Sequence, residues 1–154
     1  MKNIRVLSQN EVLEKGIEFD GDYVCYSGEY GEQVYKLPME EGGHPVNGLL
    51  YEKYDNGNIK YYSYYKDGIP NGEYVEFYDT GEIRRYCIMD GGQVLGEDII
   101  WYKNGNIKLR RYWKYGIEIS YEKFDEKGNI ISRKIEPNDT EKELLETFKK
   151  LYEE

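Results

Sequence analysis

The chain has 154 residues, a length that suits one domain with a continuous core and is too short for two independent domains. Its 30 acidic side chains outnumber its 21 basic ones, and the formal net charge of −9 argues against the phosphate backbone of a nucleic acid as a partner. We therefore predict a single domain over residues 1–154 that binds no nucleic acid.

The N-terminal segment, residues 1–45, is the most acidic part of the chain. Residues 1–47 carry four basic and nine acidic side chains. No apolar run here is long enough for a signal sequence and nothing later approaches a membrane span, so we expect a cytoplasmic protein without a membrane segment. Residues 23–26 and 30–35 have the composition of strands, and we predict an acidic cap built from degenerate strands.

The cysteines and the histidine do not form a metal-binding pattern. Cys25 and Cys87 are the only cysteines and are far apart, and His44, the only histidine, falls in a glycine-rich stretch that is typical of a turn. A zinc site needs several such ligands at close spacing, so we expect free thiols, no metal and no cofactor.

A block that repeats every 24 residues dominates the middle of the chain. Residues 54–59 are YDNGNI, residues 78–83 are YDTGEI and residues 102–107 are YKNGNI, and glycines recur in the same phase at Gly48, Gly72 and Gly96. Self-similarity at this spacing indicates one supersecondary unit per repeat, which must stack on its neighbours to complete a core.

Each unit consists of two aromatic and β-branched runs around a short Asp/Asn and Gly turn, the pattern of a β-hairpin. The predicted fold is mainly β: an antiparallel meander of hairpins over residues 46–131, whose fourth unit lies near residues 120–131. We assign one set of phase-matched apolar residues to the buried face: Ile59, Val75, Phe77, Ile83, Ile99, Trp101 and Ile107. The repeated tyrosines Tyr54, Tyr78 and Tyr102 are interpreted as structural, with hydroxyls that reach solvent or backbone.

At the C-terminus the spacing of the apolar residues changes from the alternation of strands to the spacing of a helix. After the break at Pro137, Thr140 and Glu143 predict a capping box, and residues 138–154 are predicted to form a capping α-helix. Its apolar residues share one face, which we expect to pack on the end or a face of the sheet: Leu144, Leu145, Phe148, Leu151 and Tyr152.

The return strands combine tyrosines, a tryptophan and arginines, the residue types that dominate binding hot spots. The predicted partner-binding residues are Tyr62, Tyr64, Arg84, Tyr86, Arg110, Arg111, Tyr112 and Trp113. We expect Arg111→Ala to leave the melting temperature nearly unchanged, because this face is expected to be exposed. The alternative interpretation is a solvated outer face held by cross-strand charge and aromatic–cation pairs.

No group of residues in the sequence is typical of an active site. GxSxG, HExxH and P-loop patterns are absent, and the glycines fall at turn positions of the repeat. Glu40 and Glu41 are adjacent carboxylates, but they lie in a glycine-rich stretch where we expect them to be solvated. The sequence therefore predicts a protein that is not an enzyme.

The spacing Gly-x5-Tyr-x2-Gly-x-Ile, present at residues 72–83 and 96–107, resembles the variant MORN repeat of the bacterial YwqK-type antitoxin family. The resemblance spans about residues 46–131. It implies a non-catalytic antitoxin or immunity protein that neutralises a toxin by direct binding, and the acidity of the chain favours a basic toxin as its protein partner.

The alternative function is a MORN-like scaffold for protein assembly or for attachment at a membrane surface. The net negative charge argues against binding to anionic lipid, since such binding needs a basic surface. An unpaired strand edge at the N-terminal end of the array would also allow a second copy to pair there as a homo-oligomer.

Overall fold

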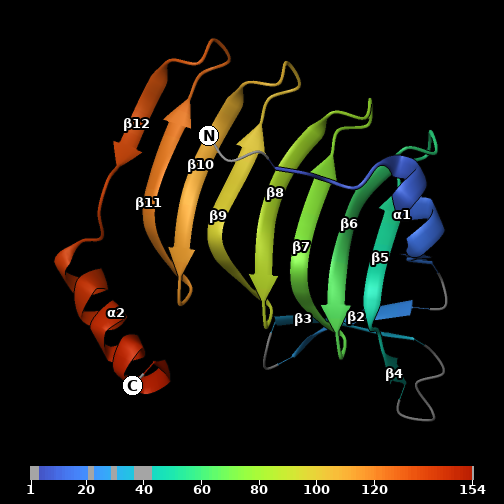
Figure 1. The fold of residues 1–154 in the computed structure, drawn as a ribbon, viewed down its shortest axis with the longest axis horizontal. Helices are drawn as coiled ribbons and strands as arrows, with labels where there is room; N and C mark the ends of the chain where they lie inside the picture. Colours follow the sequence, from blue (N-terminus) through green and yellow to red (C-terminus); the bar gives the residue numbers. More distant parts are fainter. Residues whose placement is uncertain (1–3, 21–22, 29–30, 37–42, 154) are drawn as a thin grey trace.

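The computed structural model describes residues 4–20, 23–28, 31–36 and 43–153. It confirms a mainly β fold built on a long antiparallel meander, followed by a C-terminal helix (Figure 1). The large sheet has nine strands in the order β1-β5-β6-β7-β8-β9-β10-β11-β12. Its strands are β1 (Ile17–Glu18), β5 (Gly48–Lys53), β6 (Ile59–Lys66), β7 (Ile69–Phe77), β8 (Ile83–Asp90), β9 (Gln93–Trp101), β10 (Ile107–Lys114), β11 (Ile117–Phe124) and β12 (Ile130–Lys134).

The repeated turns have one geometry. In each, the backbone N–H of the glycine donates to the carbonyl of the residue three positions earlier, as from Gly57 to Tyr54 at 2.9 Å and from Gly105 to Tyr102 at 3.0 Å. The glycines occupy the left-handed region that a side chain disfavours, with φ of 89° at Gly57 and 90° at Gly105. A register shift follows at the base of each of these hairpins, as expected for a turn with a glycine bulge.

The repeated tyrosines join each hairpin to the next one, which confirms their structural role. The hydroxyl of Tyr54 donates to the carbonyl of Phe77 at 2.6 Å, and that of Tyr102 donates to the carbonyl of Phe124 at 2.9 Å. Tyr78 makes the equivalent bond to Trp101. Each bond satisfies a polar group at the start of a turn, so the 24-residue period fixes the stacking of hairpins as well as their shape.

The cross-strand partners form rows that run across the sheet. We call front face the side that carries the row Tyr51, Tyr62, Val75, Tyr86, Ile99, Arg110, Glu122 and Arg133. The opposite side, the back face, carries the row Leu50, Ser63, Tyr74, Cys87, Asp98, Arg111, Tyr121 and Lys134. The front row changes from apolar to charged after Ile99, and the main core ends there.

Most residues predicted for the buried face are in or beside this core. Val75 and Ile59 are fully buried, and Phe77 and Ile99 are 6% exposed. Trp101 is only half-buried, as are Ile83 and Ile107. Trp101 was predicted to belong to the buried face, and it is only partly buried because it lies outside the main cluster of buried residues, which has no member from β9.

A helix that the sequence analysis missed completes the core. Helix α1 (Gln9–Lys15) packs Val12, which is fully buried, against Tyr51, Tyr62 and other front-face residues. The extended segment before it, residues 4–8, runs in front of the strands (Figure 1). The helix begins with a Ser8–Glu11 capping box, a signal that was present in the sequence.

The back face is covered over its first strands by a small sheet of β2 (Tyr23–Gly28), β3 (Gly31–Lys36) and β4 (His44–Pro45). The predicted N-terminal strands therefore exist but do not extend the meander, and His44 pairs with Lys36 in place of lying in a turn. The backbone N–H of Val34 donates to the carbonyl of Gly68 at 2.8 Å. The backbone N–H of Gly68 in turn donates to the carbonyl of Val46, also at 2.8 Å. A β-carbon at Gly68 would lie 2.8 Å from the Val34 oxygen, so this close approach requires glycine.

Helix α2 (Asp139–Tyr152) lies within the predicted range of residues 138–154, but its N-cap lies two residues before the predicted one. Asn138 is the N-cap and forms the capping box with Glu141, so the predicted Thr140–Glu143 box was wrong. No residue of α2 is fully buried, so its apolar stripe does not join the core and contacts the sheet only at one end. Phe148 and Tyr152 contact Tyr115 in the β10–β11 turn, with ring centroids 5.7 and 6.0 Å apart.

The two edges of the large sheet differ. At the N-terminal end β5 is not open, because β1 pairs with it in parallel through Ile17↔Leu50 and Glu18↔Tyr51. At the other end β12 has no strand on its outer side among the described residues, and it carries Ile131, 66% exposed. The two-residue β1 is the outermost strand at the N-terminal end and pairs with only two residues of β5, so among the described residues both ends of the sheet have an unpaired outer edge.

Candidate partner-binding surface

The eight predicted binding residues do not share one face. Tyr62, Tyr86 and Arg110 belong to the front row, and Tyr64 and Tyr112 lie in the adjoining row of the same face. Arg111 and Trp113 lie on the back face, where both contact Asp98. Arg84 is exposed beside a hairpin turn, with its guanidinium 5.8 Å from the ring centre of Tyr78.

Tyr62 is a core residue, and its assignment to an exposed surface was wrong. Its side chain is fully buried between the sheet and α1, and its hydroxyl accepts the backbone N–H of Leu7 at 2.9 Å. Burial raises the pKa of Tyr62 to about 12, although the Leu7 hydrogen bond acts in the opposite direction. Tyr64 and Tyr86 are partly buried at the margin of the same core.

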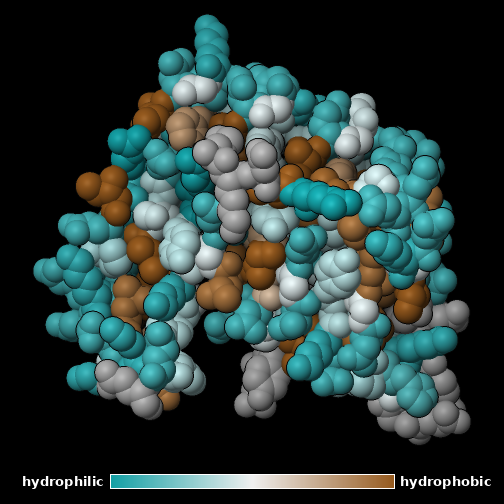
Figure 2. Space-filling view, in the orientation of Figure 1, coloured by the Kyte–Doolittle hydropathy of each residue, from teal (hydrophilic) through white to brown (hydrophobic). Residues whose placement is uncertain are grey.

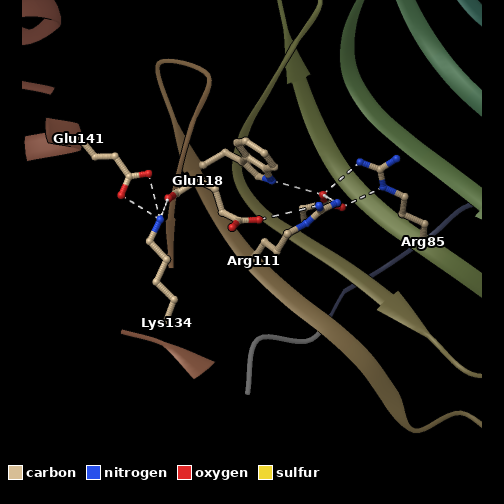
Figure 3. Close-up of polar contacts among 7 residues, drawn as sticks. Arg85, Arg111, Glu118, Lys134 and Glu141 are labelled. Atoms are coloured by element: carbon tan, nitrogen blue, oxygen red, sulfur yellow. Dashed lines mark hydrogen bonds and ion pairs between the residues drawn. The ribbon is translucent and has the colours of Figure 1, made fainter. Parts of the chain in front are cut away.

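The prediction that Arg111 is exposed was wrong as well. Its side chain is 22% exposed and lies 2.6 Å from Oδ2 of Asp98, a carboxylate with no exposed surface (Figure 3). Arg85 holds the same carboxylate through Nε at 2.9 Å and its terminal nitrogen at 3.0 Å. Trp113 donates its indole N–H to Asp98 at 3.3 Å, so four donors from three side chains meet on one acidic group.

This Asp98 cluster organises the back face. Burial alone would lower the pKa of Arg85, but the hydrogen bond and charge of Asp98 outweigh it and raise the pKa. Arg111 also lies over the ring of Trp113, at 5.2 Å, and approaches Glu118 at 3.9 Å. Two cations and two carboxylates balance one another here, which identifies the cluster as a structural feature of the sheet.

The front face has a hollow beyond the end of the core. Its volume is about 510 Å³, and it lies between the N-terminal segment and strands β7 to β10. The residues that line it are Ile4, Arg5, Glu73, Tyr86, Ile88, Leu95, Gly96, Glu97 and Tyr112. Tyr86 and Tyr112 are therefore the predicted binding residues that this site brings together.

The walls of the hollow combine apolar and acidic groups. Leu95 is 45% exposed and Tyr112 is 46% exposed, and Figure 2 shows hydrophobic residues reaching the surface on this side of the molecule. Among the described residues, neither Glu73 nor Glu97 has an ion-pair partner within 4.0 Å. Burial raises the pKa of Glu73, because the carboxylate is partly removed from water.

Two smaller hollows continue this surface towards β12. The first, about 220 Å³, shares Glu97 and Tyr112 with the main hollow, and the second, about 300 Å³, shares Ser120 and Glu122 with the first. Together they form a groove that crosses the strands of the front face. In its floor Glu122 pairs with Arg133 at 2.8 Å and Arg110 at 3.8 Å, so Arg110 is held in a charged ladder.

The lining of the main hollow was predicted only in part. Ile88, Leu95, Glu73 and Glu97 were missed, since none belongs to the residue types expected at hot spots. The available signal was position: Ile88 pairs with both Glu73 and Leu95 across neighbouring strands, which gathers them on one face.

The part of the chain that the structure describes has no group of three or more His, Cys, Asp or Glu side chains able to hold a metal ion. Cys87 is buried, and burial raises the pKa of its thiol to about 12, so it remains protonated at neutral pH. Among the described residues no helix has the length and apolar character needed to cross a bilayer.

The fold defines a class: β-hairpin meander proteins with a C-terminal helix and a groove across one face of the sheet. No family model matches the chain. It is, however, 46% identical over 137 residues to the immunity protein YwqK of Bacillus subtilis (strain 168), a match that covers 88% of this chain and 87% of that protein. The chain therefore belongs to the YwqK-type immunity protein family, which confirms the family that the sequence analysis named.

Proposed function

We propose that this protein is an immunity protein that neutralises a toxin by binding it directly and without catalysis. The observation that carries the proposal is its 46% identity, over most of both chains, to a protein named for immunity. A wide sheet with a groove across its exposed part supports a binding role, because a protein partner needs a surface of this extent with aromatic and apolar groups.

Growth tests the immunity role. The product of the neighbouring gene is expressed in a heterologous bacterial host with and without this protein. We expect that product to arrest growth alone and the protein to restore growth when the two are produced together. If the product arrests growth equally in the presence of the folded protein, the immunity assignment to this pair is refuted.

Titration then tests the mechanism. The purified toxin's activity is measured while the protein is added in increasing amounts, at a toxin concentration well above the dissociation constant. Direct binding predicts that inhibition is complete at an equimolar amount and that the recovered toxin has an unchanged mass. Inhibition by a small fraction of an equivalent, or a changed toxin mass, would show that the protein acts as an enzyme.

A further inference from the structure

The front face of the large sheet is covered over only part of its width. The core cluster that Val12 of the N-terminal segment completes draws its sheet residues from β5 to β8, and none of its members comes from β9 to β12. A sheet face with apolar groups is stable when another layer buries them. The main hollow lies at this boundary, and Leu95 and Tyr112 remain almost half exposed in it.

The charges of the hollow identify what fits there. Glu73 and Glu97 line it without an ion-pair partner among the described residues, and Arg5 is the one cation in its lining. The lining thus has one excess negative charge beside an apolar surface. A lysine or arginine matches this combination, because its aliphatic stem packs on apolar groups while its charged end reaches a carboxylate.

A second copy of the chain fits less well. A two-fold dimer places the same patch of both subunits together, so four carboxylates would face only two arginines. The net charge of −9 on each chain adds to that repulsion. Charge complementarity therefore favours a basic partner.

We propose that the hollow is the toxin-docking site and that it receives a lysine or arginine side chain of the toxin, with the charged end at Glu73 and Glu97 and the stem over Tyr86, Ile88, Leu95 and Tyr112. This inference rests on the proposed function. The partial burial that raises the pKa of Glu73 supports it independently, since a desolvated carboxylate gains more from an added cation than a hydrated one does.

A small-molecule probe tests the chemistry without the toxin. n-Butylguanidinium, which reproduces an arginine side chain, and n-butylurea, its neutral counterpart, are each titrated into the isotope-labelled protein and followed by amide chemical shifts. We expect saturable shifts around Gly96, Glu97 and Tyr112 with the cation alone, and their loss in the Glu73→Gln/Glu97→Gln variant. Equal shifts with both probes, or shifts spread over all acidic residues, would overturn the proposal.

The toxin complex supplies the second test, with a control matched in charge. Glu73→Gln/Glu97→Gln is compared with Glu14→Gln/Glu126→Gln, which neutralises two exposed carboxylates outside the hollow. We expect the first variant to raise the Kd about tenfold or more and to weaken its salt dependence, and the second to stay within about threefold of wild type. Equal Kd values for both variants refute the docking site alone, whereas a wild-type protein that fails to bind refutes the proposed function itself.

Discussion

Replacement of Asp98 by alanine tests whether the Asp98 cluster on the back face stabilises the sheet. The change leaves Arg85 and Arg111 close together and removes the acceptor of four hydrogen bonds. Removing one partner of a buried ion pair costs about 3–5 kcal/mol. The arginines are 25% and 22% exposed and regain some hydration, so we expect the lower end, about 3 kcal/mol. For a chain of this length that is a fall in Tm of about 6–12 °C.

Urea and thermal unfolding measure this effect, and a double-mutant cycle assigns it. Arg111→Ala and the Asp98→Ala/Arg111→Ala double variant give the coupling energy, which we expect to exceed about 1 kcal/mol because the groups are in contact. Arg133→Ala is the control: it breaks an exposed pair with Glu122 and should cost less than about 1 kcal/mol. If Asp98→Ala unfolds within about 0.5 kcal/mol of wild type, the cluster does not stabilise the sheet and the reasoning fails.

Three further predictions concern other parts of the fold. Burial raises the pKa of Tyr62 from 10 to about 12 and that of Cys87 from 9 to about 12, so the unfolded chain loses these protons first. Their contribution to stability is complete below about pH 9 and is lost as the pH rises to about 12. The Tm, measured at several pH values across this range, should therefore decrease less with pH for Tyr62→Phe than for wild type. Tyr102→Phe removes one bond between hairpins and should cost about 1 kcal/mol in urea unfolding; no change would show that water replaces it. Leu151→Ser, at a position 66% exposed, should stay within about 0.5 kcal/mol of wild type, whereas Phe148→Ala should destabilise α2 by circular dichroism because it contacts Tyr115; equal effects would contradict the described packing.

The meander was predictable because its signals are local. A turn glycine such as Gly57 and the alternation of each strand act within a few residues, and the 24-residue period repeats them. The N-cap of α2 was missed by two residues because Asn138 and Thr140 both suit an N-cap and each has a glutamate three residues later, Glu141 and Glu143.

The binding residues were harder to predict because their exposure depends on distant segments. Tyr62 is buried by α1, some fifty residues earlier in the chain, so its own surroundings in the sequence do not show it. Arg110 and Arg111 are neighbours of the same type, yet alternation places them on opposite faces, one in an ion ladder and one at Asp98. The repeat identifies which residues share a face of the sheet. The segments that cover each face, however, lie outside the repeated part of the sequence.

The tyrosine bonds between hairpins give the array a direction. Each donor precedes its acceptor carbonyl, by 23 residues for Tyr54 and Tyr78 and by 22 for Tyr102. During synthesis the hairpins that carry Tyr54, Tyr78 and Tyr102 therefore leave the ribosome before the carbonyl that accepts their hydroxyl. Shortening the array from its C-terminal end leaves a tyrosine hydroxyl without its acceptor carbonyl, whereas shortening it from the other end leaves a carbonyl without its tyrosine donor. Adding or deleting a hairpin therefore has different consequences at the two ends of the sheet.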